Sequence, residues 1–138
     1  MILGIGTDLV DVRRIENLIQ KYGLKFLEKT FTKSEILASE RYKDQKLKAM
    51  FFAKRFSAKE AFSKAVGCGF GDNIKFLDLS VENDKKGKPI LKVEGHSSSY
   101  VAILFPETKI KIDLSLSDEY PMALAFVVIS SDFLGRGI

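Results

Sequence analysis

Charged side chains of both signs gather between residues 55 and 64. Glu60 stands there among three cations, Arg55, Lys59 and Lys64. Mg²⁺ prefers hard oxygen ligands, usually one or two protein carboxylates completed by substrate phosphates and water. A carboxylate surrounded by cations therefore suits a site that holds a metal ion against phosphate groups. The spacing from Glu60 to Lys64 is equally typical of an ordinary ion pair on a helix surface.

Arg55 and Lys59 are four residues apart, so a helix would place these two like charges next to each other. Such a pair destabilises an isolated helix by roughly 0.2 to 0.5 kcal/mol. Both side chains would also project into a broad apolar arc of the same helix. Either their aliphatic stems extend past the core to solvent, or anionic groups nearby neutralise them. The spacing leaves both alternatives open.

Asp8 is the candidate for a second carboxylate. In a strand it would share one face with Gly4 and Gly6, and the missing side chains there would leave room for a bulky ligand. The alternative is that Asp8 caps a turn from a strand into a helix. The pattern Gly-x-Gly-x-Asp is not a nucleotide-binding fingerprint by itself, because it lacks the third glycine and no βαβ unit is evident around it.

The elements that position these residues begin with a strand at residues 3–9, which alternating apolar side chains predict. From residue 12 the apolar residues recur at helical spacing and predict a helix over residues 12–22. Asp11 is suited to cap the start of this helix, and Gly23 is suited to end it. The basic side chains of the helix then face solvent.

Two further helices are expected before the chain turns to strands. Thr32 and Glu35 have the spacing of a capping box, which predicts a second helix that fades near Asp44. A third and longer helix follows from about Leu47 to Val66, and glycine at position 67 ends it. This long central helix carries Glu60 and its neighbouring cations.

The remaining segments predict a mainly antiparallel sheet. Residues 77–81 and 91–93 flank a turn-forming segment and indicate a hairpin with a basic tip. A short helix is expected at 97–105, and residues 110–117 alternate like a strand. The nearly unbroken apolar run at 122–129 suits a central strand.

Length and composition limit the architecture to one domain. The chain has 138 residues, 46% of them hydrophobic, which is enough for one sizeable core but not for two ordinary domains. The order of elements favours a single compact α+β domain over residues 1–138. No apolar run is long enough to span a bilayer, and the first residues lack signal-peptide order. We therefore expect a cytoplasmic protein without a membrane partner.

The net charge of +4 at pH 7 suggests an acidic partner or a phosphate-rich ligand. Nucleic acid is equally compatible with the charge alone. However, the sequence has no RGG-like tract, zinc-finger spacing or RNP-type aromatic motif, so we expect no nucleic-acid partner.

Several segments together resemble the holo-acyl-carrier-protein synthases. The most specific are Gly4-Ile5-Gly6-Thr7-Asp8, Arg14-Ile15-Glu16 and the run from Arg55 to Ala65. The resemblance extends over almost the whole chain through Phe31-Thr32-x-x-Glu35, Gly87-Lys88-Pro89 and Ser115 to Tyr120. It implies the 4′-phosphopantetheinyl transferase fold and Mg²⁺-dependent transfer of 4′-phosphopantetheine from coenzyme A to a serine of the acyl carrier protein. Adenosine 3′,5′-bisphosphate would be the other product.

The same resemblance implies roles for individual residues. By position, Asp8 and Glu60 would hold Mg²⁺ against the pyrophosphate of coenzyme A. The phosphate and adenylate contacts would come from Arg55, Ser63, Lys64 and Gly67. The attacking serine needs a base, and we expect Glu60 to serve through an ordered water. Lys64 would stabilise the departing phosphate.

Partners also follow from the resemblance. Members of this family bind the strongly acidic carrier protein on basic side chains of the first helix, here Arg14 and Lys21, with Arg13 beside them. A solvated helix face is the alternative explanation of these charges. The family is usually trimeric, with the active site at the junction between subunits, so a homotrimer is expected on that ground alone.

One position departs from the family pattern. Members commonly have a histidine after the Ser/Thr-rich stretch before the last strand, and this chain has Asp118 there, which removes a possible phosphate contact. Two other function classes stay open. One is a basic module that binds nucleic acid or coenzyme A without turnover. The other is an assembly protein whose apolar strand at 122–129 and Phe-rich helix form a subunit interface, although core burial explains both features more simply.

Overall fold

Five strands form two sheets in the part of this computed structural model that is described, residues 1–106 and 109–131. The larger sheet is antiparallel with the order β1-β5-β4, from β1 (Ile2–Asp11), β4 (Ile110–Glu119) and β5 (Met122–Ser131). A separate antiparallel hairpin pairs β2 (Leu79–Asn83) with β3 (Pro89–Val93). The expectation that the apolar run at 122–129 forms a central strand is confirmed, because β5 has a partner on each edge.

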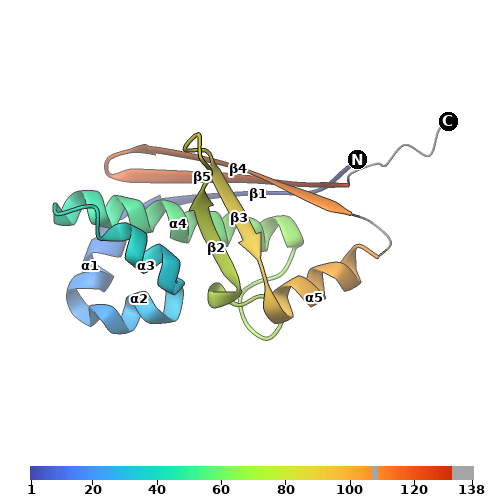
Figure 1. Cartoon of the computed structure of the whole chain (residues 1–138), viewed down its shortest axis with the longest axis horizontal. Helices are drawn as coiled ribbons and strands as arrows, with labels where there is room; N and C mark the ends of the chain where they lie inside the picture. Colours follow the sequence, from blue (N-terminus) through green and yellow to red (C-terminus); the bar gives the residue numbers. More distant parts are fainter. Residues whose placement is uncertain (107–108, 132–138) are drawn as a thin grey trace.

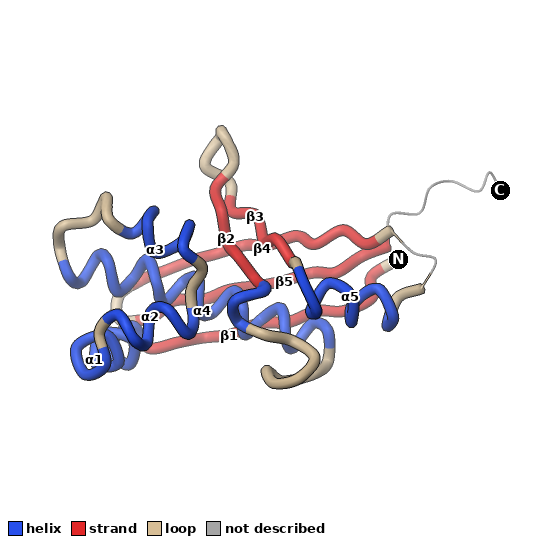
Figure 2. The backbone as a smooth tube through the Cα atoms, turned by 60° about the horizontal axis from the view of Figure 1, so that its bottom comes forward, coloured by secondary structure: helices blue, strands red, loops and turns tan. Residues whose placement is uncertain are grey.

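The helices gather around α4 (Gln45–Val66), the long helix expected from the sequence. The helices α1 (Val12–Tyr22) and α3 (Lys33–Ser39) have the expected caps, Asp11 and the Thr32–Glu35 capping box. The helix α3 ends at Ser39, earlier than the expected end near Asp44. Figure 2 shows α1 to α3 near one end of α4 and α5 (Gly95–Leu104) near the other. The described chain therefore has the expected α+β organisation.

Two helices were not expected in the described residues. One is the 3-10 helix η1 (Phe76–Asp78), so the first hairpin strand begins at Leu79 and not at the expected residue 77. The other is α2 (Leu24–Thr30). Gly23 ends α1 with a positive φ of 58° and at the same time begins α2. A glycine at this point permits an abrupt change of direction that other residues rarely adopt. With only seven residues and no side-chain cap, α2 is too short to leave a clear periodic pattern in the sequence.

The sheet lies against α4, and two glycines of β1 set how closely they approach (Figure 1). A Cβ atom added to Gly6 would lie 1.9 Å from the carbonyl oxygen of Ala61, and one added to Gly4 would lie 2.0 Å from that of Ala65. The expectation that these glycines leave room for a ligand is therefore wrong. The backbone of α4 fills that space.

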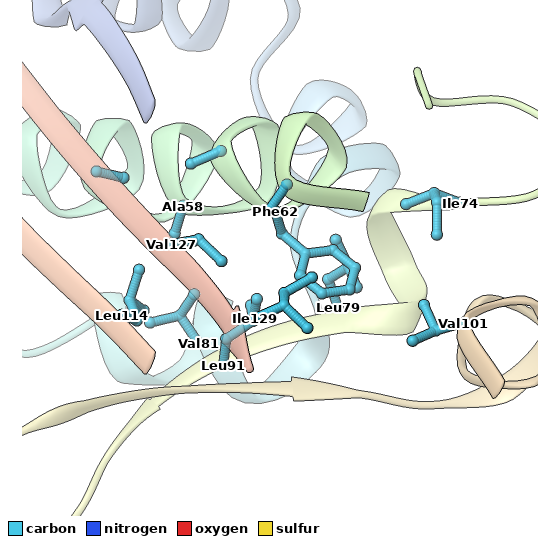
Figure 3. Packing of buried hydrophobic residues seen from close by; sticks show 13 residues of the cluster. Ala58, Phe62, Ile74, Leu79, Val81, Leu91, Val101, Leu114, Val127 and Ile129 are labelled. Atoms are coloured by element: carbon cyan, nitrogen blue, oxygen red, sulfur yellow. The ribbon is translucent and has the colours of Figure 1, made fainter. Parts of the chain in front are cut away.

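Two apolar clusters lie on either half of α4. The first joins the C-terminal half of α4 to the sheet, the hairpin and α5, and Figure 3 shows Phe62 of α4 next to Ile129 of β5. The second joins the N-terminal half of α4 to α1 and the segments after it, around Phe31 and Phe52. The helix α4 thus contributes side chains to both clusters, and it can position residues on several of its sides.

The outer face of the sheet, turned away from α4, is apolar and exposed. The side chains of Ile5, Leu9, Leu124 and Phe126 are between 40% and 62% exposed. In register, position 9 pairs with 124, position 126 lies two residues beyond 124 on the same face, and position 5 lies four residues before 9. Within the described residues, no helix is both long and apolar enough to cross a membrane.

Candidate metal and phosphate site

Asp8 lies on β1 with its carboxylate turned towards α4. Its side chain is only 15% exposed, and its backbone oxygen accepts a 2.7 Å hydrogen bond from the hydroxyl of Ser57 on α4. The alternative that Asp8 caps the turn into the first helix is wrong, because Asp11 does so, accepting a 3.0 Å hydrogen bond from the amide of Arg13. The carboxylate of Asp8 is therefore available for another contact.

Lys64 makes that contact across the gap between α4 and β1. Its ammonium nitrogen lies 3.3 Å from Oδ1 of Asp8 and donates to the carbonyl oxygen of Thr7 at 2.9 Å. The surface pair between Glu60 and Lys64 that the spacing suggested is replaced by this contact between two elements. Because 56 positions separate Lys64 from Asp8, no local pattern indicates the pairing.

Glu60 lies one turn before Lys64 on α4 and is electrostatically coupled to Asp8. Burial raises the pKa of Glu60 above its usual value, and the charge of Asp8 raises it further. The charges of Lys64 and Arg14 oppose this rise. Two carboxylates that repel each other in a partly dehydrated place are an arrangement that a bound cation stabilises.

The donor set fits a hard cation that keeps part of its hydration. No group of three or more His, Cys, Asp or Glu side chains with metal-binding geometry occurs in residues 1–106 and 109–131. The protein therefore offers Asp8 and Glu60 without a closed cage. This matches the way Mg²⁺ is usually held, through one or two carboxylates with the remaining positions taken by water and substrate phosphates.

Ser63 and Gly67 lie at the C-terminal end of α4. The hydroxyl of Ser63 donates to the backbone oxygen of Glu60 at 2.8 Å, and the side chain is buried. Gly67 ends the helix in the left-handed conformation, with φ at 89°, and its amide bonds to the backbone oxygen of Ser63. Both residues thus shape the helix end beside Glu60 and Lys64, and their expected contacts with coenzyme A stay predictions.

Arg55 does not join this cluster within the chain. Five positions separate it from Glu60, so the two point in directions roughly 140° apart around α4. Its guanidinium stacks 3.7 Å from the ring centre of Phe51, and Nη2 donates to Asn83 at the turn end of the hairpin. Burial lowers the pKa of Arg55 to about 10, and its Nε is buried without a hydrogen-bond partner. An anion approaching from the hairpin side would satisfy this group.

Lys59 has a different role from the one its neighbourhood suggested. Its ammonium group is fully buried and lies 2.7 Å from Oε1 of Glu35, and it also donates to the backbone oxygens of Thr30 and Phe76. The alternative in which an anion neutralises Lys59 is therefore confirmed. The anion is the protein's own carboxylate on α3, however, and not a ligand near Glu60.

The basic face of α1 contains the residues expected to bind a carrier protein. Arg13 is neutralised by Asp11 at 2.6 Å. Arg14 is exposed, lies over the ring of Phe56 at 5.6 Å and is close enough to Glu60 to affect its pKa. Lys21 also lies on the surface, over a neighbouring tyrosine ring. Of the three, Arg14 is the one that connects this face with the candidate metal site.

Asp118, the departure from the family pattern, forms an ion pair with Lys54 of α4 at 2.8 Å. Close to it, the hydroxyl of Tyr120 donates to Glu16 of α1 at 3.0 Å. The end of β4 is therefore tied to both α4 and α1. Sequence reasoning missed these contacts, as it missed that of Ser57 with Asp8. The approach of β1 to α4 does have a signal in the sequence, because Gly4 and Gly6 are two positions apart in the strand and Ala61 and Ala65 are four positions apart in the helix.

Comparisons with known proteins agree with this geometry. A family model described as the 4′-phosphopantetheinyl transferase superfamily matches residues 4–125. The holo-[acyl-carrier-protein] synthase of Ehrlichia chaffeensis is 46% identical over 132 residues, which cover 96% of this chain and 99% of that protein. The synthase of Wolbachia pipientis from Culex pipiens is 47% identical over 129 residues, covering 94% and 98%.

Solved structures show the same similarity. The crystal structure of the synthase from Neisseria meningitidis matches with a TM-score of 0.82 and 36% identity, covering 94% of this chain and 99% of that one. The synthase from Bacillus anthracis, solved in complex with CoA (3′,5′-ADP), matches with a TM-score of 0.76 and 38% identity, covering 94% and 96%.

Proposed function

The chain belongs to the 4′-phosphopantetheinyl transferase superfamily, and from this premise we propose that it acts as a holo-acyl-carrier-protein synthase. It transfers 4′-phosphopantetheine from coenzyme A to a serine of apo-acyl carrier protein and releases adenosine 3′,5′-bisphosphate. The observation that carries this function is the convergence of Asp8, Glu60 and Lys64 between β1 and α4. Relatives named as holo-[acyl-carrier-protein] synthases favour it over a binding module without turnover.

The residues of this chain divide the work of the reaction. Mg²⁺, when bound, would neutralise and orient the pyrophosphate oxygens of coenzyme A. Asp8 and Glu60 are placed to hold it, and Lys64 is placed to donate a hydrogen bond to a phosphate oxygen. The serine oxygen of the carrier protein attacks the phosphorus that carries the pantetheine arm, and the pyrophosphate P–O bond on the opposite side breaks.

Proton removal from the attacking serine is assigned to Glu60, through an ordered water. A carboxylate with a raised pKa is a stronger base than an ordinary one when it is ionised, so burial and the charge of Asp8 favour this role. The proton passes from the serine hydroxyl to the water while a proton of the water passes to Glu60. Arg55, Ser63 and Gly67 are proposed to bind the rest of coenzyme A.

The proposed reaction is tested by incubating the protein with apo-acyl carrier protein and coenzyme A, with Mg²⁺ or with a chelator. The carrier should gain the mass of one phosphopantetheine arm only when Mg²⁺ is present. Unchanged carrier in both samples would contradict the proposed function. Equal loading in both would keep the transfer but reject the proposed metal.

The acidic carrier protein is proposed to bind the exposed basic face of α1, with Arg14 nearest the site. Charge complementarity of this kind mainly accelerates association and is screened by salt. Arg14→Glu should therefore raise the KM for carrier protein at low salt, and the difference from wild type should shrink at high salt. An unchanged KM at low salt, in steady-state loading assays, would reject this docking surface.

The exposed apolar face of the sheet supports a homotrimer, the assembly that is usual in the family. Side chains such as Leu124 and Phe126 would be covered by neighbouring copies, as large exposed apolar patches commonly are. Sedimentation equilibrium measures the mass of the assembly, and a monomer at micromolar concentration would contradict the proposal. We also propose a cytoplasmic location, which cell fractionation would test.

A further inference from the structure

The ammonium group of Lys64 occupies the position of a counter-ion between β1 and α4. It lies 3.3 Å from Oδ1 of Asp8 and 2.9 Å from the backbone oxygen of Thr7. The carboxylate that it contacts is only 15% exposed and is electrostatically coupled to Glu60. Such a pair of carboxylates needs a nearby cation, and here the protein supplies one from its own chain.

The contact is one that can be exchanged. The side chain of Lys64 is 55% exposed, so it can leave Asp8 without disturbing the core. Its separation from Asp8, 3.3 Å, exceeds the usual length of a charge-assisted hydrogen bond, roughly 2.7 to 2.9 Å. By contrast, the backbone oxygen of Thr7 accepts at an ordinary distance, so Lys64 remains near the site when it leaves the carboxylate.

A divalent cation and Lys64 compete for the same oxygen. We propose that Lys64 neutralises Asp8 while no divalent ion is bound and releases it when the ion arrives, so that metal entry frees an ammonium group for a phosphate of coenzyme A. This inference rests on the proposed function, which assigns Asp8 to the metal. It adds that the lysine changes partners within the site and that its first partner lowers the apparent metal affinity.

The first test measures Mn²⁺ affinity without coenzyme A, by titration followed with electron paramagnetic resonance. Lys64→Met removes the competitor and should bind Mn²⁺ about three- to fivefold more tightly than wild type, the effect of a partly exposed ion pair. Arg14→Gln removes a charge near Glu60 but no contact to Asp8, so its affinity for Mn²⁺ should increase less. Lys54 belongs to the separate pair with Asp118, so Lys54→Met should leave the affinity for Mn²⁺ unchanged. Because Lys64 is exposed, the variant should fold, and thermal melting checks this.

The second test follows Lys64 itself, through trace acetylation quantified by mass spectrometry. A lysine held by a carboxylate reacts slowly, so Mg²⁺ alone should raise the labelling of Lys64 about twofold or more, and coenzyme A with Mg²⁺ should lower it again. Lys92 is a matched internal control, because its side chain is also 55% exposed and is paired with a carboxylate, Glu82. Its labelling should stay constant throughout.

The outcomes separate this inference from the proposed function. If Asp8→Asn abolishes Mn²⁺ binding while Lys64→Met binds no more tightly than Arg14→Gln, the metal site stands and the exchange of partners is wrong. Labelling of Lys64 that does not respond to Mg²⁺ overturns the exchange as well. If Asp8→Asn binds Mn²⁺ as wild type does, the proposed metal site itself fails, and the inference fails with it.

Discussion

The two lysines on α4 that pair with carboxylates, Lys59 and Lys64, have opposite environments. Lys59 and Glu35 are fully buried, 2.7 Å apart, and both have further hydrogen bonds to the backbone of other elements. Lys64 is 55% exposed and contacts Asp8 at 3.3 Å. Only the second pair has access to solvent, a second carboxylate nearby and a cation able to leave.

The difference shows that α4 carries one ion pair that stabilises the fold and another that is suited to a binding site. A buried ion pair with complete hydrogen bonding is expensive to disturb, because removing one partner leaves an unpaired charge in the core. The Lys59–Glu35 pair accordingly joins α3 and α4, and through the amide of Val81 it reaches β2 as well. The Lys64–Asp8 pair is longer and open to solvent, which suits the exchange of partners that we propose for it.

The largest expected effect is on catalysis at the exposed site. Glu60→Gln should lower the rate of carrier loading by about 10² to 10⁴-fold, the usual contribution of a general base. The fold should be unaffected, because Glu60 is only partly buried and glutamine has nearly the same shape. Loading assays and circular dichroism measure both quantities. Full activity in this variant would remove Glu60 from the mechanism.

The buried pair should respond in stability instead. Lys59→Met leaves Glu35 buried without its cation and should lower the free energy of unfolding by about 3 to 5 kcal/mol. Lys64→Met is the matched control and should change it by less than about 1 kcal/mol. Urea denaturation of both variants measures the contrast. Equal losses in the two would show that the buried and exposed pairs do not differ as described.

Gly6→Ala tests whether the approach of β1 to α4 holds the exposed site together. The new Cβ atom would lie 1.9 Å from the backbone oxygen of Ala61, so the strand must move away from the helix. Overpacking of this kind costs about 1 to 3 kcal/mol, sometimes more. We expect lower stability by urea denaturation and weaker Mn²⁺ binding. Unchanged metal binding would mean that the position of Asp8 does not depend on this contact.

The smallest expected effect is a pH dependence that belongs to the exposed site. Because the pKa of Glu60 is raised in the folded state, its contribution to stability is fully present below its ordinary value of 4.5 and is lost as pH rises through the raised pKa. Without Mg²⁺, wild type should therefore lose stability relative to Glu60→Gln between acidic and neutral pH. Urea denaturation at both pH values measures this. A difference that is independent of pH would contradict the raised pKa.

Much of the fold could be predicted from the sequence. The α+β organisation, the caps at Asp11 and Thr32, the long helix and the central strand at 122–129 are confirmed. So is the resemblance to the holo-acyl-carrier-protein synthases. Caps, periodicity and turn residues act over a few positions, so they can be recognised from the sequence alone.

The sequence by itself thus determined most of the elements, the family and the candidacy of Asp8 and Glu60. Only the tertiary structure decided which partners the charges take and which face of β1 packs on α4. The Lys59–Glu35 pair spans 24 positions and the Lys64–Asp8 pair spans 56. Contacts at such separations depend on how whole elements pack, and the glycines of β1 show this most directly. Their missing side chains admit a helix backbone instead of a ligand.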